Sequence, residues 1–383
     1  MAEIMVVAGE ASGDMHAAEV VRKIKSINPE VDFFGLGGMH LKKEGVEVIF
    51  DPTKLSTIGF LEGAKHFKKL YQVLNNLERE LKNRRPEAAF LVDYTYFNRK
   101  VAKRAAKLDV PTVNYFAPSA WVWGKWRAKK IANYGVKVAS VFPMEEEVYR
   151  KAGAEVEFVG HPLVDMVEPK FDRDQLETEK DLELKDRMVI GILPGSRGQE
   201  VKSLLPKMLK AAQLIVKEYP TVKFLLPLAN TISRSEVEES VSNYNIDITL
   251  LSGGSQSVME ASDLILVASG TASLEAACLK TPMVIAYKTS WSSYILGKLL
   301  VRISHIGLPN IIAKEKVVPE LLQSEVTGQN LAKEAVDILN NQQRYQKIKR
   351  KLNQVKNQLG EGGAAKRVAK LVLDTGGIKF EAG

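Results

Sequence analysis

Short apolar runs alternate with amphipathic stretches along the first half of the chain. One amphipathic stretch, residues 67–86, repeats leucine and valine at helical spacing and predicts a long helix with one buried face. Near-continuous apolar strands separated by helices are typical of a parallel sheet that is covered on both faces. The pattern therefore predicts an N-terminal Rossmann-like, doubly wound domain over residues 1–170. Its clearest strands are residues 4–9, 31–38, 87–93, 110–116 and 136–142.

The alternation stops at residues 171–187 and then restarts. This segment is highly charged and lacks strong apolar periodicity, so we expect a linker with one exposed helix. Residues 188–330 predict a second doubly wound domain, which makes the expected fold class α/β with two Rossmann-like parallel-sheet domains. Residues 331–383 predict a basic helical tail that packs back towards the N-terminal domain. The strands expected in the second domain are residues 188–197, 222–229, 246–253, 263–270 and 282–287.

Composition narrows the class of protein. A chain of 383 residues is long enough for two packed cores, and its single cysteine, Cys278, rules out a disulfide framework. No apolar stretch reaches the roughly 18–20 residues of a membrane span, and the start lacks the basic region of a signal peptide, so we expect a cytoplasmic protein. The net charge of +8 fits nucleic acid, an anionic membrane surface or phosphorylated ligands without choosing between them.

The second domain contains two candidate phosphate-binding turns, because ligands of open parallel sheets bind beyond the C-terminal ends of strands. After residues 263–268, Gly270 and Thr271 open a helix whose N–H groups and dipole favour a phosphate, and Glu275 could accept the hydroxyls of a ribose. Equally, a hydroxyl could cap this helix and Glu275 complete a capping box. The turn at Ser196 and Arg197 adds a guanidinium that is suited to bind a diphosphate. Alternatively, Arg197 is an ordinary surface arginine on a glycine-rich turn.

The first domain contains acidic groups at the same kind of position. Asp93 ends the strand of residues 87–93 and is a candidate general base, although aspartates also cap turns there. The first turn has the shape of a phosphate cradle, yet it carries Glu10 and Asp14 beside the small residues Ser12 and Gly13. These carboxylates would repel a phosphate, and Asp14 could cap the helix that follows. The histidines are scattered without metal-ligand spacing, so we expect no metal and no cofactor.

Taken together, the ordered motifs resemble the lipid A disaccharide synthase family, whose members are glycosyltransferases with two Rossmann-like domains of the GT-B type facing a central cleft. The resemblance covers nearly the whole chain. Its motifs are "VAGEASGD", "APSAWVW", "GHPL", "LPGSRGQEV", "ASGTASLEAA", "TPMVIAY", "GLPNIIA" and "PELLQ". It implies an inverting transfer from UDP-2,3-diacylglucosamine to 2,3-diacylglucosamine 1-phosphate, which gives UDP and a β-1,6 disaccharide 1-phosphate.

The resemblance also implies roles for single residues. Asp93 matches the family's proposed base, and Asn310 joins Arg197 and Glu275 as residues of the UDP-sugar site. Glu10, Ser12, Gly13 and Asp14 match the loop that faces the acceptor, where Glu10 and Asp14 could accept hydrogen bonds from sugar hydroxyls. The chain departs from the family motif D-A-P-D-F-N, because Tyr96 stands where the second acid is expected.

Acylated substrates imply a protein that works peripherally at the inner face of the cytoplasmic membrane. Two segments combine aromatic and basic residues as interfacial segments do: Trp121, Trp123, Lys125, Trp126, Arg127, Lys129 and Lys130 in one, and Trp291, Tyr294, Lys298 and Arg302 in the other. Each could equally line a cleft or a buried seam. No nucleic-acid motif is present. A UDP-sugar 2-epimerase and a non-catalytic sugar-nucleotide-binding protein remain as alternative functions.

Overall fold

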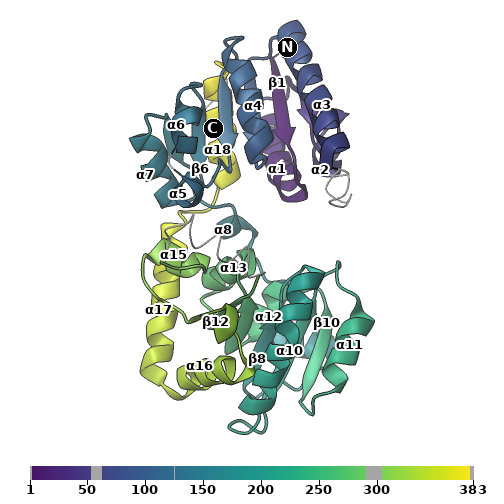
Figure 1. Ribbon diagram of the computed structural model, residues 1–383, viewed down its shortest axis with the longest axis vertical. Helices are drawn as coiled ribbons and strands as arrows, with labels where there is room; N and C mark the ends of the chain where they lie inside the picture. Colours follow the sequence, from purple (N-terminus) through teal and green to yellow (C-terminus); the bar gives the residue numbers. More distant parts are fainter. Residues whose placement is uncertain (1, 53–62, 125, 290–303, 380–383) are drawn as a thin grey trace. The chain divides into compact units, whose positions relative to one another are not determined.

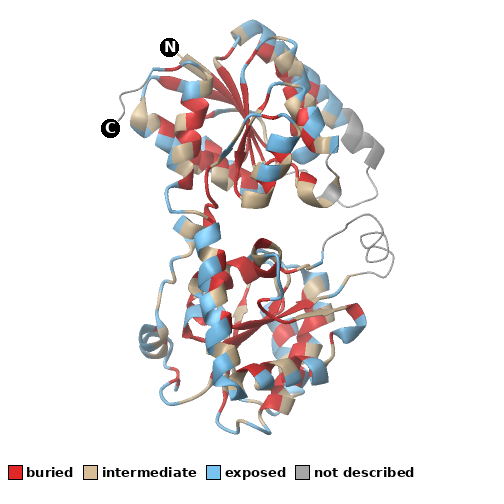
Figure 2. Ribbon diagram, turned by 90° about the vertical axis from the view of Figure 1, so that its left-hand side faces the viewer, coloured by how far each residue is buried: buried red, intermediate tan, exposed pale blue. Residues whose placement is uncertain are grey.

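The computed structural model describes residues 2–52, 63–124, 126–289 and 304–379, apart from the side chains of residues 63–68 and 123. The chain forms two compact units (Figure 1). Unit 1 consists of Met1–Pro162 and Leu359–Gly383, and unit 2 of Leu163–Gln358. Each contains one parallel sheet between layers of helices, and the buried residues follow the strands (Figure 2). The predicted fold class is confirmed.

Unit 1 has a seven-stranded parallel sheet in the order β3-β2-β1-β4-β5-β6-β7. The five predicted strands are confirmed, because runs of consecutive apolar residues bury both faces of the central strands. The prediction missed β3 and β7, which are short edge strands with partly exposed side chains. The strands are β1 (Ala2–Ala8), β2 (Val31–Leu36), β3 (Glu47–Phe50), β4 (Ala88–Val92), β5 (Thr112–Tyr115), β6 (Lys137–Ser140) and β7 (Val156–Phe158).

Helices cover both faces of this sheet. On one face, α1 (Ala11–Ile27) and α18 (Ala364–Thr375) lie side by side and share a core with β1 and β4 (Figure 1). The other face is covered by α3 (Gly63–Arg84), α4 (Thr95–Ala106), α5 (Ala120–Trp123), α6 (Trp126–Ala132) and α7 (Pro143–Lys151). The helix predicted at residues 67–86 is confirmed, with Leu77 and Leu81 fully buried. A short helix, α2 (Met39–Lys43), follows β2.

Unit 2 has a six-stranded parallel sheet in the order β10-β9-β8-β11-β12-β13. The five predicted strands are present, and the prediction missed the three-residue β13. The strands are β8 (Val189–Leu193), β9 (Lys223–Leu228), β10 (Ile248–Ser252), β11 (Leu264–Ala268), β12 (Met283–Tyr287) and β13 (Glu320–Leu322). The helices around them are α8 (Leu163–Met166), α9 (Arg173–Lys180), α10 (Gly198–Ile215), α11 (Arg234–Ser242), α12 (Ser255–Ala261), α13 (Thr271–Leu279), α15 (Leu308–Ala313), α16 (Gly328–Asn340) and α17 (Gln342–Gln358).

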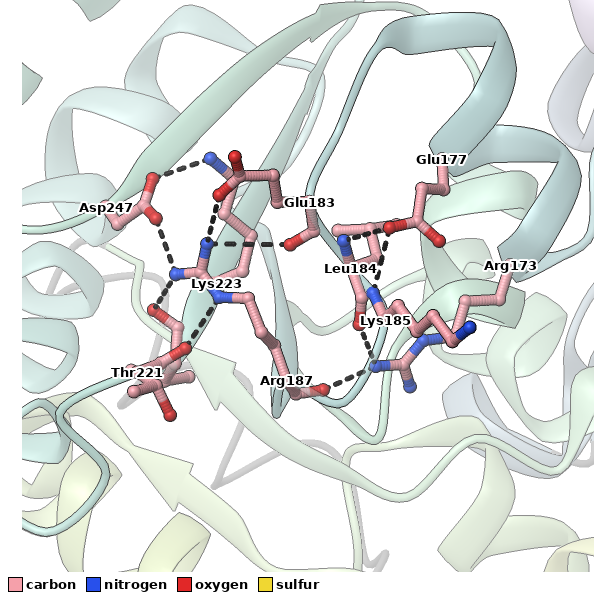
Figure 3. Close-up of polar contacts among 10 residues, drawn as sticks. Arg173, Glu177, Glu183, Leu184, Lys185, Arg187, Thr221, Lys223 and Asp247 are labelled. Atoms are coloured by element: carbon pink, nitrogen blue, oxygen red, sulfur yellow. Dashed lines mark hydrogen bonds and ion pairs between the residues drawn. The ribbon is translucent and has the colours of Figure 1, made fainter.

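Residues 171–187 contain the one exposed helix that was expected, but the segment is not a linker, because it folds onto the sheet of unit 2 (Figure 3). A capping box at Asp172 starts α9, and Leu176 is buried against β8. Arg173 donates to the carbonyl of Leu184 at 2.9 Å, and Arg187 donates to the carbonyl of Thr221 at 2.8 Å. The charged side chains thus tie the segment to backbone carbonyls, which a count of charges along the sequence cannot reveal.

The expected helical tail also divides differently. Helices α16 and α17 belong to unit 2, and only α18, after the boundary at Gln358, returns to unit 1. Its buried Val368 and Val372 join the core of the first sheet. The expectation that the tail packs onto the N-terminal domain therefore holds for α18 alone.

Candidate functional site

Unit 2 contains a cavity of about 290 Å³ at the C-terminal ends of β8, β9 and β11. The strand order runs in opposite directions from β8 and β11, so the cavity lies at a topological switch point, where open α/β sheets bind ligands. The structure brings five of the six predicted UDP-sugar residues together there: Ser196, Arg197, Gly270, Thr271 and Glu275.

The N-terminus of α13 opens into this cavity. Gly270 is the N-cap residue and supplies no side-chain cap, so the first N–H groups of the helix remain available to an anion. A Cβ added at Gly270 would meet no atom within 4 Å, which means that the glycine leaves open space beside these donors. The alternative capping box is absent, because Ser273 donates to the carbonyl of Gly270 at 2.7 Å and Glu275 bonds elsewhere.

Glu275 lines the cavity from the second turn of α13. Its carboxylate accepts a hydrogen bond from the amide of Gln256 at 3.3 Å, a partner that sequence reasoning missed. Burial raises the pKa of Glu275, and the Gln256 hydrogen bond opposes this rise. A partly buried carboxylate that faces a cavity is suited to accept hydrogen bonds from ligand hydroxyls.

The turn after β8 supplies the positive charge. Arg197 is the N-cap residue of α10, its side chain is 82% exposed, and it forms an ion pair with Glu200 at 2.9 Å. Glu200 also lines the cavity and was not predicted. Gly195 has φ +110°, and a Cβ there would lie 2.5 Å from the Glu200 carboxylate, so the turn requires glycine. The hydroxyl of Thr231 fixes the loop by donating to the Ser196 carbonyl at 2.6 Å.

Asn310 does not reach this cavity, contrary to the expectation drawn from the family. It lies on α15 with no exposed surface. Its amide nitrogen donates to the Val318 carbonyl at 2.8 Å and to Glu320 at 2.6 Å, and its oxygen accepts from the N–H groups of Val317 and Val318. These four bonds fill the hydrogen-bonding capacity of the amide. Asn310 therefore fixes the segment that precedes β13 within unit 2.

In unit 1, Asp93 lies directly after β4 with φ +38°. The Ser12 hydroxyl donates to its carboxylate at 3.2 Å, and burial raises the pKa of Asp93 against the effect of this bond. Gly13 packs so closely that a Cβ there would lie 3.3 Å from the Asp93 Cβ. The fold thus brings the predicted base and two predicted acceptor residues together at the first turn of α1.

The two acids of the first turn have different surroundings. Glu10 is the exposed N-cap residue of α1; burial raises the pKa of Tyr94, and the charge of Glu10 adds to this rise. Asp14 is 2% exposed, and its carboxylate accepts from the N–H groups of Gly38 at 2.7 Å, His40 at 2.9 Å and Leu41 at 3.3 Å. Both expected roles of Asp14 are therefore wrong: it neither faces a sugar nor caps α1, but caps α2, which is distant in sequence.

Two histidines that are far apart in the sequence lie near this turn. The ring of His16 stacks on Phe116 with centroids 4.7 Å apart, and His161 meets the same ring edge-on at 6.0 Å. Burial lowers the pKa of His16 to about 4 and that of His161 to about 3, so both are neutral at pH 7. Their spacing in the sequence does not indicate this proximity. Phe116 follows β5 and His161 follows β7, so the two histidines meet the same ring only once the sheet has formed.

No group of three potential metal ligands occurs among the described residues. In the same residues, no helix has the length and apolar character needed to cross a membrane. Trp126 is 51% exposed, whereas the indole nitrogen of Trp121 is buried. The side chain of Trp123 lies outside the described part of the chain, as do five further residues predicted for membrane contact: Lys125, Trp291, Tyr294, Lys298 and Arg302.

Two parallel-sheet units, one with an open helix N-terminus at its switch point, define a GT-B-type fold. Solved structures agree across the whole chain. A putative UDP-N-acetylglucosamine 2-epimerase from Listeria monocytogenes matches with a TM-score of 0.66 and 15% identity, over 97% of this chain and 96% of that protein. MurG from Acinetobacter baumannii matches with a TM-score of 0.60 and 14% identity, over 97% and 99%. At these identities the likeness shows the fold alone.

The family follows from sequence comparison. The model of the lipid-A-disaccharide synthetase family matches residues 4–373. The lipid-A-disaccharide synthase of Geobacter metallireducens is 38% identical over 98% of both chains, and that of Nitrosococcus oceani is 38% identical over 97% of this chain and 95% of its own. The chain belongs to the lipid-A-disaccharide synthetase family and is a glycosyltransferase of lipid A disaccharide formation.

Proposed function

We propose that the unit 2 cavity binds the UDP moiety of the donor, UDP-2,3-diacylglucosamine. The observation that carries this proposal is the meeting of Arg197, Gly270, Thr271 and Glu275 around one cavity at the switch point. The open N–H groups and positive end of α13 would bind the diphosphate. Arg197 would exchange its ion pair with Glu200 for the diphosphate, and Glu275 would accept the ribose hydroxyls.

The acceptor, 2,3-diacylglucosamine 1-phosphate, would bind at the first turn of unit 1. Glu10, Ser12 and Gly13 would form this site, and Asp93 would act as general base on the acceptor's primary hydroxyl. An α-linked donor and a β-linked product require one inversion at the anomeric carbon, so no enzyme nucleophile is needed. The hydroxyl oxygen attacks that carbon, its proton passes to the Asp93 carboxylate, and the bond to UDP breaks.

Charge on the departing UDP would be stabilised by Arg197 and the helix N-terminus. This mechanism uses neither a metal nor a cofactor. Because both substrates carry acyl chains, we further propose that the protein works in the cytoplasm, peripherally attached to the inner face of the cytoplasmic membrane.

The test is product analysis with purified protein, donor and acceptor. The proposal predicts UDP release that depends on the acceptor and a disaccharide with a β-1,6 linkage. The fold shared with UDP-N-acetylglucosamine 2-epimerases makes an epimerase the second candidate, and it predicts a C2-epimerised sugar nucleotide in the absence of acceptor. Appearance of that epimer, or UDP release independent of acceptor, would contradict the proposal.

A further inference from the structure

Unit 1 presents two large aromatic side chains to solvent on neighbouring helices. Tyr96 on α4 is 57% exposed, and Trp126 at the start of α6 is 51% exposed. A single exposed ring is ordinary on a protein surface, and exposed aromatic area marks a contact surface only where neighbouring groups join into one patch. The surface around them is therefore a candidate for docking.

Cations join the two rings into one surface. The guanidinium of Arg99 lies 5.3 Å from the ring centroid of Tyr96 and 5.8 Å from that of Trp126. The ammonium of Lys100 is 4.8 Å from Tyr96, and that of Lys130 is 4.8 Å from Trp126. These five residues, Tyr96, Arg99, Lys100, Trp126 and Lys130, are called the aromatic–cationic patch below.

The charge of this surface is of one sign. Helices α4 and α6 together carry seven lysines and arginines and no aspartate or glutamate. Of these seven, only Arg104 forms an ion pair among the described residues, with Glu78. Arg99 and Lys100 lie over the Tyr96 ring, and neither forms an ion pair among the described residues. The patch therefore attracts anions, and its rings add apolar area.

We infer that the aromatic–cationic patch is where unit 1 contacts the headgroup layer of an anionic phospholipid bilayer. The inference rests on the proposed function, in which both substrates carry acyl chains. Lysine and arginine are attracted to anionic headgroups, and tryptophan and tyrosine favour the interface because each combines an apolar ring with a polar tip. A double-stranded nucleic acid or the acceptor's own phosphate would use the cations but would not need Trp126 to face an apolar layer.

The experiment is vesicle co-sedimentation of the full chain, without substrates, on vesicles of phosphatidylcholine with or without 30% phosphatidylglycerol. The double variant R99Q/K130Q should bind anionic vesicles about 25-fold more weakly than wild type, since each cation near such a surface contributes about fivefold. Trp126→Ser should weaken binding as well, although it removes no charge. The matched control is K23Q/K366Q, two exposed lysines on α1 and α18 across the sheet, which should lose less than twofold.

Equal losses in R99Q/K130Q and the control would overturn the inference, because binding would then depend on net charge alone. Loss with R99Q/K130Q but none with Trp126→Ser would also overturn it, and would favour a purely electrostatic partner such as a double-stranded nucleic acid. Each variant is also assayed on short-acyl substrates without vesicles, where turnover should match wild type. A raised KM for the acceptor there would assign the patch to substrate instead. Because the binding assay contains no substrate, its result is independent of whether the proposed reaction occurs.

Discussion

Replacing Asp14 tests whether this acid of the glycosyltransferase motif acts on substrate or on the fold. Its buried carboxylate accepts two short hydrogen bonds, from the N–H groups of Gly38 at 2.7 Å and His40 at 2.9 Å, and a longer one from Leu41. A hydrogen bond to a charged group contributes about 1.5–3 kcal/mol, so Asp14→Ala should lower the free energy of unfolding of unit 1 by about 3–6 kcal/mol. Asp14→Asn keeps one acceptor oxygen and should lose about half as much.

The assay is urea unfolding followed by tryptophan fluorescence. Three of the four tryptophans belong to unit 1, and the Trp291→Phe background makes the signal specific to that unit. With a slope of about 2–3 kcal/mol per molar urea, the midpoint should fall by about 1–3 M in Asp14→Ala. A midpoint within about 0.2 M of the background protein, together with a raised KM for the acceptor, would refute the assignment and restore Asp14 as a substrate contact.

Three further predictions concern other buried or glycine positions. Gly195→Ala should destabilise unit 2 by about 1–3 kcal/mol in thermal unfolding, because of its positive φ and the nearby carboxylate, whereas Gly270→Ala should fold normally and bind UDP more weakly in calorimetry. Asn310→Ala should lower the free energy of unfolding and leave UDP affinity unchanged. Glu275→Ala should weaken UDP binding and leave the free energy of unfolding unchanged, and an unchanged UDP affinity in Glu275→Ala would contradict the ribose contact. Burial raises the pKa of Glu145 from 4.5 to about 7, so folded unit 1 binds this proton more tightly than the unfolded chain does, and the stability that the group contributes falls as pH rises through that window. Glu145→Gln should therefore gain stability relative to wild type as pH rises from about 4.5 to 7. A difference in urea midpoint that stays constant over this range would count against the prediction.

The strands that carry the site could be predicted from the sequence, because each is a run of apolar residues buried on both faces. The turns after β4, β8 and β11 follow directly from these strands, and this is why Asp93, Arg197 and Gly270 were identified. Short edge strands such as β7 and β13 lack such a run. Their positions depend on pairing with a neighbouring strand, which is a tertiary contact.

The errors share one physical cause. The sequence shows that Asp14 and Asn310 are polar, and the resemblance assigned both to substrate, but their partners are backbone groups brought near by folding. The charged segment at residues 171–187 was misread for the same reason, since Arg173 and Arg187 are tied to carbonyls. Sequence pattern indicates which strand a polar residue follows, and only the fold indicates what it contacts.

The central claim is that Asp93 removes the acceptor proton, and its most direct test is the turnover of Asp93→Asn. Asparagine keeps the shape at this strand end and cannot take a proton. The account predicts unchanged UDP affinity and urea midpoint, with turnover lower by about 10²–10⁴-fold, the scale of a lost general base. Near-normal turnover in Asp93→Asn would contradict the account and assign the proton transfer to Glu10, the exposed acid of the same turn.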